Sequence, residues 1–130
     1  MKNKSRKSLT KKLDELVKQI TRLRDGFTCQ VCDKHIEGCN AHTCHVVAKG
    51  NGASWRRFDL LNVFVGCMKC HDWWHKQPLE SGKWFAKRFR ARDKYLEKYK
   101  YGKSAKISTD EMINLIDQYK QKFEELKNGV

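Results

Sequence analysis

Two Cys-x-x-Cys pairs constrain the fold of this chain more than any other feature of its sequence. Cys29 and Cys32 form the first pair, Cys67 and Cys70 form the second, and 34 residues separate them. Two thiolates at this spacing suit a tight turn that supplies two corners of a tetrahedron, so two such turns complete a four-cysteine zinc site. We therefore expect a structural Zn²⁺ that staples a small core, with a functional insert between the pairs.

Other interpretations of the cysteines stay open, namely a redox dithiol, a disulfide pair or an iron centre. Disulfides are disfavoured because the basic N-terminal segment has no apolar stretch typical of a secretory signal. The run from Cys67 to His71 also matches the attachment pattern of c-type haem, which would leave the first pair without a role. Cys39 and Cys44 are spare thiols outside the two pairs.

Charge is distributed unevenly along the 130 residues, which carry 28 Lys and Arg against 15 Asp and Glu, a formal net charge of +13. Residues 1–26 have a net charge of +6 and residues 83–103 of +7, whereas residues 27–82 have +1 and residues 104–130 have −1. This surplus predicts an anionic partner, nucleic acid first. The candidate DNA contacts are Arg22, Arg24, Lys49, Arg56, Arg57, Lys87, Arg88, Arg90 and Arg92. No apolar run is long enough to form a transmembrane helix. We expect no membrane partner, although composition alone leaves an acidic membrane surface or an acidic protein open.

The residue pattern predicts a mainly helical α+β protein with three regions. Residues 1–26 form a basic tail, over 1–7, and an amphipathic helix capped by Ser8 or Thr10. Residues 27–82 form the core, with short strands at 27–31, 44–47 and 63–66, a glycine-rich loop at 50–52, and a helix over 69–77 that Pro78 stops. Residues 83–130 form one basic helix over 83–100 and an amphipathic last helix that the Ser108/Glu111 capping box opens.

Four of the five histidines lie beside the cysteine pairs, in the nearly neutral central region. His42 and His45 fall in the insert, and His71 and His75 lie four residues apart after the second pair. Side chains at this spacing share one face of a helix, where two imidazoles can bind one metal ion. His35 has no such context and is expected to be a loop residue.

The order of these elements resembles the HNH (His-Me finger, ββα-metal) endonucleases in their zinc-bound form. The matching residues are Cys29-x-x-Cys32, His45-Val46-Val47, Leu61-Asn62-Val63 and Cys67-x-x-Cys70-His71. The chain is similar above all to the phage NinG (Rap) recombination endonucleases, through Leu13-Asp14, the run from Ile20 to Asp25, His42-x-x-His45, Arg57-Phe58 and the position of Asn62. The resemblance covers roughly residues 13–85.

The resemblance implies a ββα-metal core that hydrolyses DNA phosphodiesters with Mg²⁺ or Mn²⁺. His45 would be the general base, Asn62 would hold the loop that carries it, and His71, His75 and His42 would ligate the catalytic metal. The resemblance also implies branched recombination intermediates, of the Holliday junction or D-loop type, as substrates, and a phage or prophage protein that acts in the cytoplasm of its bacterial host. A homodimer would suit such a substrate.

One departure from the family pattern concerns the residue before the general base. Many HNH enzymes have an Asp or His metal ligand there, whereas this chain has Cys44, and a thiolate is a poor ligand for Mg²⁺. The competing hypotheses are a non-catalytic zinc-knuckle DNA-binding protein, an RNA substrate, or a protein-interaction role for the last helix.

Overall fold

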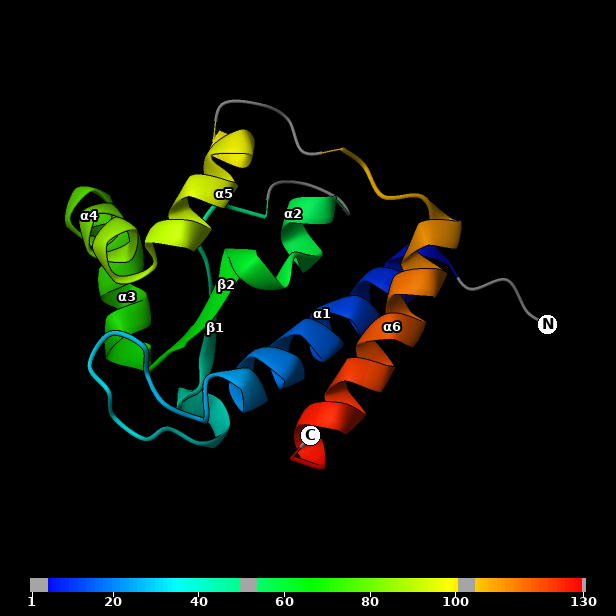
Figure 1. Ribbon diagram of the computed structural model, residues 1–130, viewed down its shortest axis with the longest axis horizontal. Coiled ribbons are helices and arrows are strands. Elements are labelled where there is room, and N and C mark those ends of the chain that lie inside the picture. Colours follow the sequence, from blue (N-terminus) through cyan, green and yellow to red (C-terminus); the bar gives the residue numbers. More distant parts are fainter. Residues whose placement is uncertain (1–4, 50–53, 101–104, 130) are drawn as a thin grey trace.

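The computed structural model describes residues 5–49, 54–100 and 105–129. For residues 98–100 it describes the backbone and not the side chains. Figure 1 shows helices gathered around one small β-hairpin. The helices are α1 (Arg6–Arg24), α2 (Trp55–Phe58), α3 (Met68–Lys76), α4 (Pro78–Arg88), α5 (Arg90–Lys100) and α6 (Thr109–Lys127). Strands β1 (His42–His45) and β2 (Val63–Gly66) are accompanied by 3-10 turns at Gly38–Asn40 and Leu60–Asn62. The prediction of a mainly helical α+β fold is confirmed.

Strands β1 and β2 are antiparallel, with His45 opposite Val63 and His42 opposite Gly66. The edge of β2 that faces away from β1 is closed by polar groups at and after the end of α1. Arg24 donates a hydrogen bond to the Val63 carbonyl (2.7 Å), and Asp25 accepts one from the Val65 amide (2.9 Å). The Gln30 amide donates to the Val65 carbonyl at 2.9 Å. The outer edge of β2 is thereby hydrogen-bonded without a third strand.

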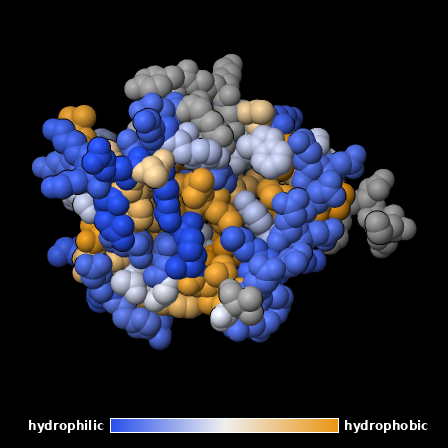
Figure 2. Space-filling model, viewed as in Figure 1, coloured by the Kyte–Doolittle hydropathy of each residue, from blue (hydrophilic) through white to orange (hydrophobic). Residues whose placement is uncertain are grey.

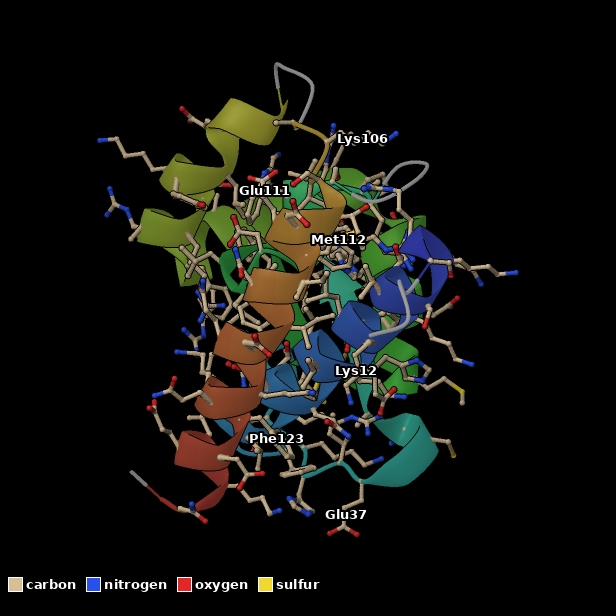
Figure 3. The ribbon with its side chains drawn as sticks, turned by 90° about the vertical axis from the view of Figure 1, so that its right-hand side faces the viewer. Lys12, Glu37, Lys106, Glu111, Met112 and Phe123 are labelled. Carbon is tan, nitrogen blue, oxygen red and sulfur yellow. The ribbon has the colours of Figure 1, made fainter. Side chains whose placement is uncertain are left out.

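Helices α1 and α6 cover one side of the hairpin and lie alongside each other (Figures 1 and 3). The leucines of α1 recur every three or four residues, so they form one apolar stripe that packs against α6. The buried residues shared by this cluster are Leu9, Leu13, Leu16, Val17, Phe58, Val63, Ile107, Met112, Leu115 and Ile116. The expected capping box is present, because Ser108 and Glu111 each accept from the other's backbone amide.

An aromatic cluster covers the other side of the hairpin. The ring of Phe64 in β2 lies 5.0 Å from that of Trp74 in α3 and 6.4 Å from that of Phe89, which follows α4. Trp84 and Phe85 of α4 complete the cluster. The hairpin therefore forms the middle layer between two apolar clusters, and α3 to α5 are fixed relative to it.

Several predicted boundaries differ from the structure. The expected helix over 83–100 is divided at Phe89 (φ −127°, ψ 59°), whose ring turns into the aromatic cluster. Helix α3 ends at Lys76, before Pro78 as predicted, and Pro78 also begins α4, since a helix needs no amide donor at its first position. Helix α1 begins at Arg6, with Ser5 as its cap. At Phe89, packing of the ring overrides the local helix signal, whereas at Ser5 and Pro78 local capping geometry sets the boundary.

The strand predictions are met in part. The strand at 63–66 is confirmed as β2, whereas β1 begins at His42, two residues before the predicted strand. Residues 27–31 form no strand, and the bridge between Thr28 and His35 closes a turn instead. Residues 1–4 of the expected basic tail and residues 50–52 of the glycine-rich loop lie outside the described residues. Among the described residues, no helix is both long enough and apolar enough to span a membrane.

The close approach of Gly66 to Cys44 gives a first test of this packing. A Cβ at Gly66 would lie 3.0 Å from the Cys44 Sγ. We expect Gly66→Ala to lower the free energy of unfolding by about 1–3 kcal/mol because the buried site is overpacked. Urea denaturation of Gly66→Ala, Cys44→Ala and the double variant would measure the coupling between the sites. Strictly additive costs would contradict the contact.

Candidate metal centre and histidine cleft

The four cysteines of the two Cys-x-x-Cys pairs come together in one cluster. The Sγ atoms of Cys29, Cys32, Cys67 and Cys70 all lie within 4.8 Å of one another, and none is in a disulfide. Those of Cys32 and Cys67 are 3.9 Å apart, and two sulfurs bound to one tetrahedral zinc at ~2.3 Å stand ~3.8 Å apart. Among the described residues, this is the one group of three or more His, Cys, Asp or Glu side chains that converges in this way. The cluster is a candidate structural zinc site.

Local backbone geometry builds both turns of the cluster. In the first, Asp33 adopts a left-handed conformation (φ 63°), and the Cys32 amide points at the Cys29 sulfur (3.5 Å). In the second, Cys67 caps α3 and its sulfur accepts from the Cys70 amide (3.4 Å). Each turn therefore presents its sulfur pair to the same point.

The acidity of the thiols fits a cation-binding site. Burial opposes ionisation of Cys29, but backbone amides of the two turns donate to its sulfur and together lower the pKa of this thiol to about 7. Burial and then the neighbouring thiols raise the pKa of Cys70. Four thiolates at this separation repel one another, so a bound divalent cation is what would let all four ionise.

The cysteine cluster connects directly to a cleft that contains histidines. Cys67 lies between β2 and α3, and α3 carries His71 and His75. A cleft of about 620 Å³ lies between α1, α3 and the end of β1. Its polar side chains are Asp14, Lys18, Thr43, His45, Lys49, His71 and His75.

His45 is held in the neutral form on one wall of the cleft. Its Nε2 lies 3.2 Å from the Arg57 carbonyl oxygen. Because a carbonyl only accepts, Nε2 carries a proton and Nδ1 keeps its lone pair. Burial lowers the pKa of His45 to about 4, and the positive charges of Lys49 and Arg57 act in the same direction. At neutral pH the imidazole is therefore unprotonated at Nδ1 and able to accept a proton.

Asn62 ties together the two segments that flank His45. Its side chain is fully buried. Its Oδ1 accepts from the Val47 amide (2.8 Å), and its Nδ2 donates to the carbonyls of Val47 and Arg56 (both 2.9 Å). The chain leaving β1 is thereby fixed against the segment whose Arg57 carbonyl orients the His45 ring.

His71 and His75 lie together on the facing wall of the cleft. Their Nε2 atoms are 3.3 Å apart, the separation expected of two nitrogens ~2.0 Å from one tetrahedral metal ion. Burial lowers the pKa of His71, and the nearby His75 and His42 lower it further. His71 therefore favours the uncharged form that binds metals.

The structure places His42 against this pair but outside the cleft, and it places Cys44 in the core. The His42 ring stacks on that of His71 at 4.9 Å and is not among the cleft-lining residues. Cys44 is buried, and burial raises the pKa of its thiol. The position that precedes the predicted general base therefore holds a neutral thiol inside the aromatic cluster, and His71 and His75 alone among the predicted ligands face the cleft.

The candidate DNA contacts fall into different surroundings. Lys49 lines the cleft, and Arg57 forms an ion pair with Asp14 (2.7 Å) beside His45. Arg22 donates to the carbonyls of Gly38 and Ala41, and Arg24 donates to those of Leu60 and Val63. These two arginines support the backbone, while Lys87 and Arg90 are exposed. Contact of any of these residues with DNA stays a prediction.

Asp14 and Thr43 line the cleft, although neither was predicted from the sequence as a site residue. Asp14 comes directly after the buried Leu13 of α1, and its one signal in the sequence is the Leu13-Asp14 match named with the resemblance above. Thr43 alternates with Cys44 along β1, so its side chain lies on the strand face shared with His45. Its hydroxyl oxygen is buried with no hydrogen-bond partner among the described residues.

No family model, no curated protein and no solved structure matches this chain.

Removing one cysteine of the cluster tests the metal centre. We expect wild type to bind about one zinc per chain, and Cys70→Ser to lose it together with cooperative unfolding, because zinc binding contributes directly to folding. Cys39→Ser is the matched control, since Cys39 is exposed and lies outside the cluster. Elemental analysis and thermal unfolding would measure both effects. Equal zinc content in the two variants would contradict the site.

Truncating Asn62 tests its role in holding the His45 segment. Asn62→Ala leaves two part-buried carbonyls and one amide without their Asn62 partner, so we expect a loss of about 3 kcal/mol in the free energy of unfolding by urea. Asn40→Ala is the control, because Asn40 makes one exposed hydrogen bond, to the Met68 amide. A cost for Asn62→Ala no larger than that of the control would disprove this role.

Proposed function

We propose that this chain is a metal-dependent endonuclease that hydrolyses phosphodiester bonds in DNA. The observation that carries the proposal is the convergence of His45, His71 and His75 on one open cleft beside the cysteine cluster. Residues far apart in the sequence thus bring a proton acceptor and a metal-binding pair to the same space. The resemblance of this ββα arrangement to HNH endonucleases, described from the sequence, supports the same reaction.

His45 is the general base of the proposed reaction. Its free Nδ1 accepts a proton from a water molecule, while the Arg57 carbonyl fixes the ring through Nε2. Trp74 of α3 also donates a hydrogen bond to the His45 carbonyl (3.1 Å). The base therefore keeps its position relative to α3, which carries the other two histidines.

His71 and His75 would hold the catalytic metal, and Zn²⁺ in the cysteine cluster would be structural. A divalent cation such as Mg²⁺ or Mn²⁺ supplies charge stabilisation to the phosphate and to the leaving oxygen when bound. Two imidazoles are softer ligands than Mg²⁺ prefers, so Mn²⁺ or Zn²⁺ suits this pair at least as well. Thr43 and Asp14 provide further oxygen atoms at the cleft.

The positive groups at the cleft would bind the phosphate backbone. Lys49 lies at the mouth beside His45, and its charge attracts the phosphate that it would contact. The resemblance to recombination endonucleases favours branched DNA as the substrate. A homodimer would present two clefts to the two equivalent strands of a four-way junction.

Cleavage assays with matched histidine variants test the proposal. We expect wild type to cut supercoiled plasmid or a four-way junction in the presence of a divalent metal, and His45→Ala to be at least ~10²-fold slower with DNA binding retained. His35→Ala is the control, since His35 is exposed and pairs with Glu37 outside the cleft. Intact plasmid, duplex and junction across Mg²⁺, Mn²⁺ and Zn²⁺ would instead favour a non-catalytic zinc-knuckle DNA-binding protein.

A further inference from the structure

Three arginines gather where α4 meets α5, next to the outer edge of β2. The guanidinium carbons of Arg88 and Arg92 lie 4.3 Å and 4.6 Å from the centroid of one ring, that of Phe89. Arg24 and Arg88 both act electrostatically on Arg92: burial lowers its pKa, and these two positive charges lower it further. Figure 2 shows strongly hydrophilic side chains over α4 and α5 on this face.

Little negative charge compensates this cluster. Asp25 is the carboxylate that acts on Arg92, but it already accepts from Arg24 (2.9 Å) and from the Val65 amide (2.9 Å). The Nη1 of Arg92 is buried with no hydrogen-bond partner among the described residues. Arg88 has one long hydrogen bond, to the Gln30 side chain (3.4 Å). A buried guanidinium donor without a partner is costly, so the cluster lacks an anion.

The aromatic cluster holds these donors in place. Phe89 packs against Phe85 (5.2 Å between centroids) and Trp84 (6.0 Å), so its ring is a fixed surface. Two guanidinium planes close to that ring lose little freedom when they bind a ligand. A planar fork of N–H donors suits the oxygens of a phosphate.

The arginine cluster is separate from the His45 cleft. His45 lies on β1, whereas Arg24 contacts the edge of β2 that faces away from β1. None of the three arginines lines the cleft. An extended ligand that reaches both places must cross the hairpin.

We propose that Arg88 and Arg92, held against Phe89, form a second phosphate-binding site for the nucleic-acid backbone, outside the His45 cleft. The proposal deepens the proposed function, since it adds a contact for the same class of substrate. Bound nucleic acid would extend from the cleft, past β2, to the junction of α4 and α5. The site binds phosphate and carries no base specificity.

A binding assay without cleavage tests this site. The background is zinc-loaded His45→Ala, the probe is a fluorescein-labelled 20-base-pair duplex, and fluorescence anisotropy is recorded from 50 to 200 mM salt. We expect Arg88→Gln and Arg92→Gln each to weaken binding about tenfold and to reduce the salt slope by about one. Lys94→Gln is the matched control, because Lys94 is an exposed cation on α5, the helix that carries Arg92. Arg92→Lys keeps the positive charge but not the planar set of N–H donors, so we expect a loss of affinity between those of wild type and Arg92→Gln.

Equal losses of affinity in Arg88→Gln, Arg92→Gln and Lys94→Gln would overturn the proposal, because the net positive charge of α4 and α5 alone would then explain the binding. The thermal unfolding midpoint of each variant shows whether the variant is still folded. Arg92→Gln should unfold no earlier than wild type, since it removes a cation that two others repel, and added sulfate should raise the midpoint of wild type more than that of this variant. Equal sulfate shifts would also overturn the site. DNA binding is measured apart from hydrolysis, so failure of this site and failure of the nuclease proposal are distinguishable.

Discussion

A two-stranded hairpin has little stability in water, and the arrangement of this molecule follows from how that hairpin is supported. The Arg24 guanidinium and the Asp25 carboxylate close the free edge of β2, so α1 is attached to the sheet through hydrogen bonds as well as through its leucines. The first cysteine turn adds a further bond, from the Gln30 amide to the Val65 carbonyl. Because the same strand leads into Cys67, the four thiols meet at the place where the hairpin is anchored.

This support explains why the histidines share one cleft. The second cysteine turn sets the start of α3, and Trp74 fixes the helix to the His45 carbonyl. Asn62 then fixes the segment that follows β1 to the segment that contains Arg57. Separate parts of the structure therefore position His45 and the His71/His75 pair. Both parts are attached to the hairpin, which holds them in a fixed relative position.

Electrostatics divides the cationic residues into groups with different roles. Arg22 and Arg24 donate to backbone carbonyls, so their charge contributes to folding. Arg57 is paired with Asp14 at the cleft. Arg88 and Arg92 lie against Phe89 with little compensation. The net charge of +13 is thus a poor guide to any single contact. A guanidinium that donates to a carbonyl already has its hydrogen-bond partner, whereas one beside another cation is repelled and lacks an anion.

The sequence by itself determined the elements whose cause is local. The cysteine spacing required tight turns, the leucine period of α1 required a buried stripe, and Ser108 with Glu111 required a helix start, and all three are present. Only the tertiary structure decided what depends on distant partners. The break at Phe89 arises because its ring packs on Phe64, 25 residues earlier, and Cys44 is a core residue because the pleat of β1 turns it away from the cleft. Local sequence signals act over a few residues, whereas the burial of a side chain depends on which distant residues pack against it in the folded protein.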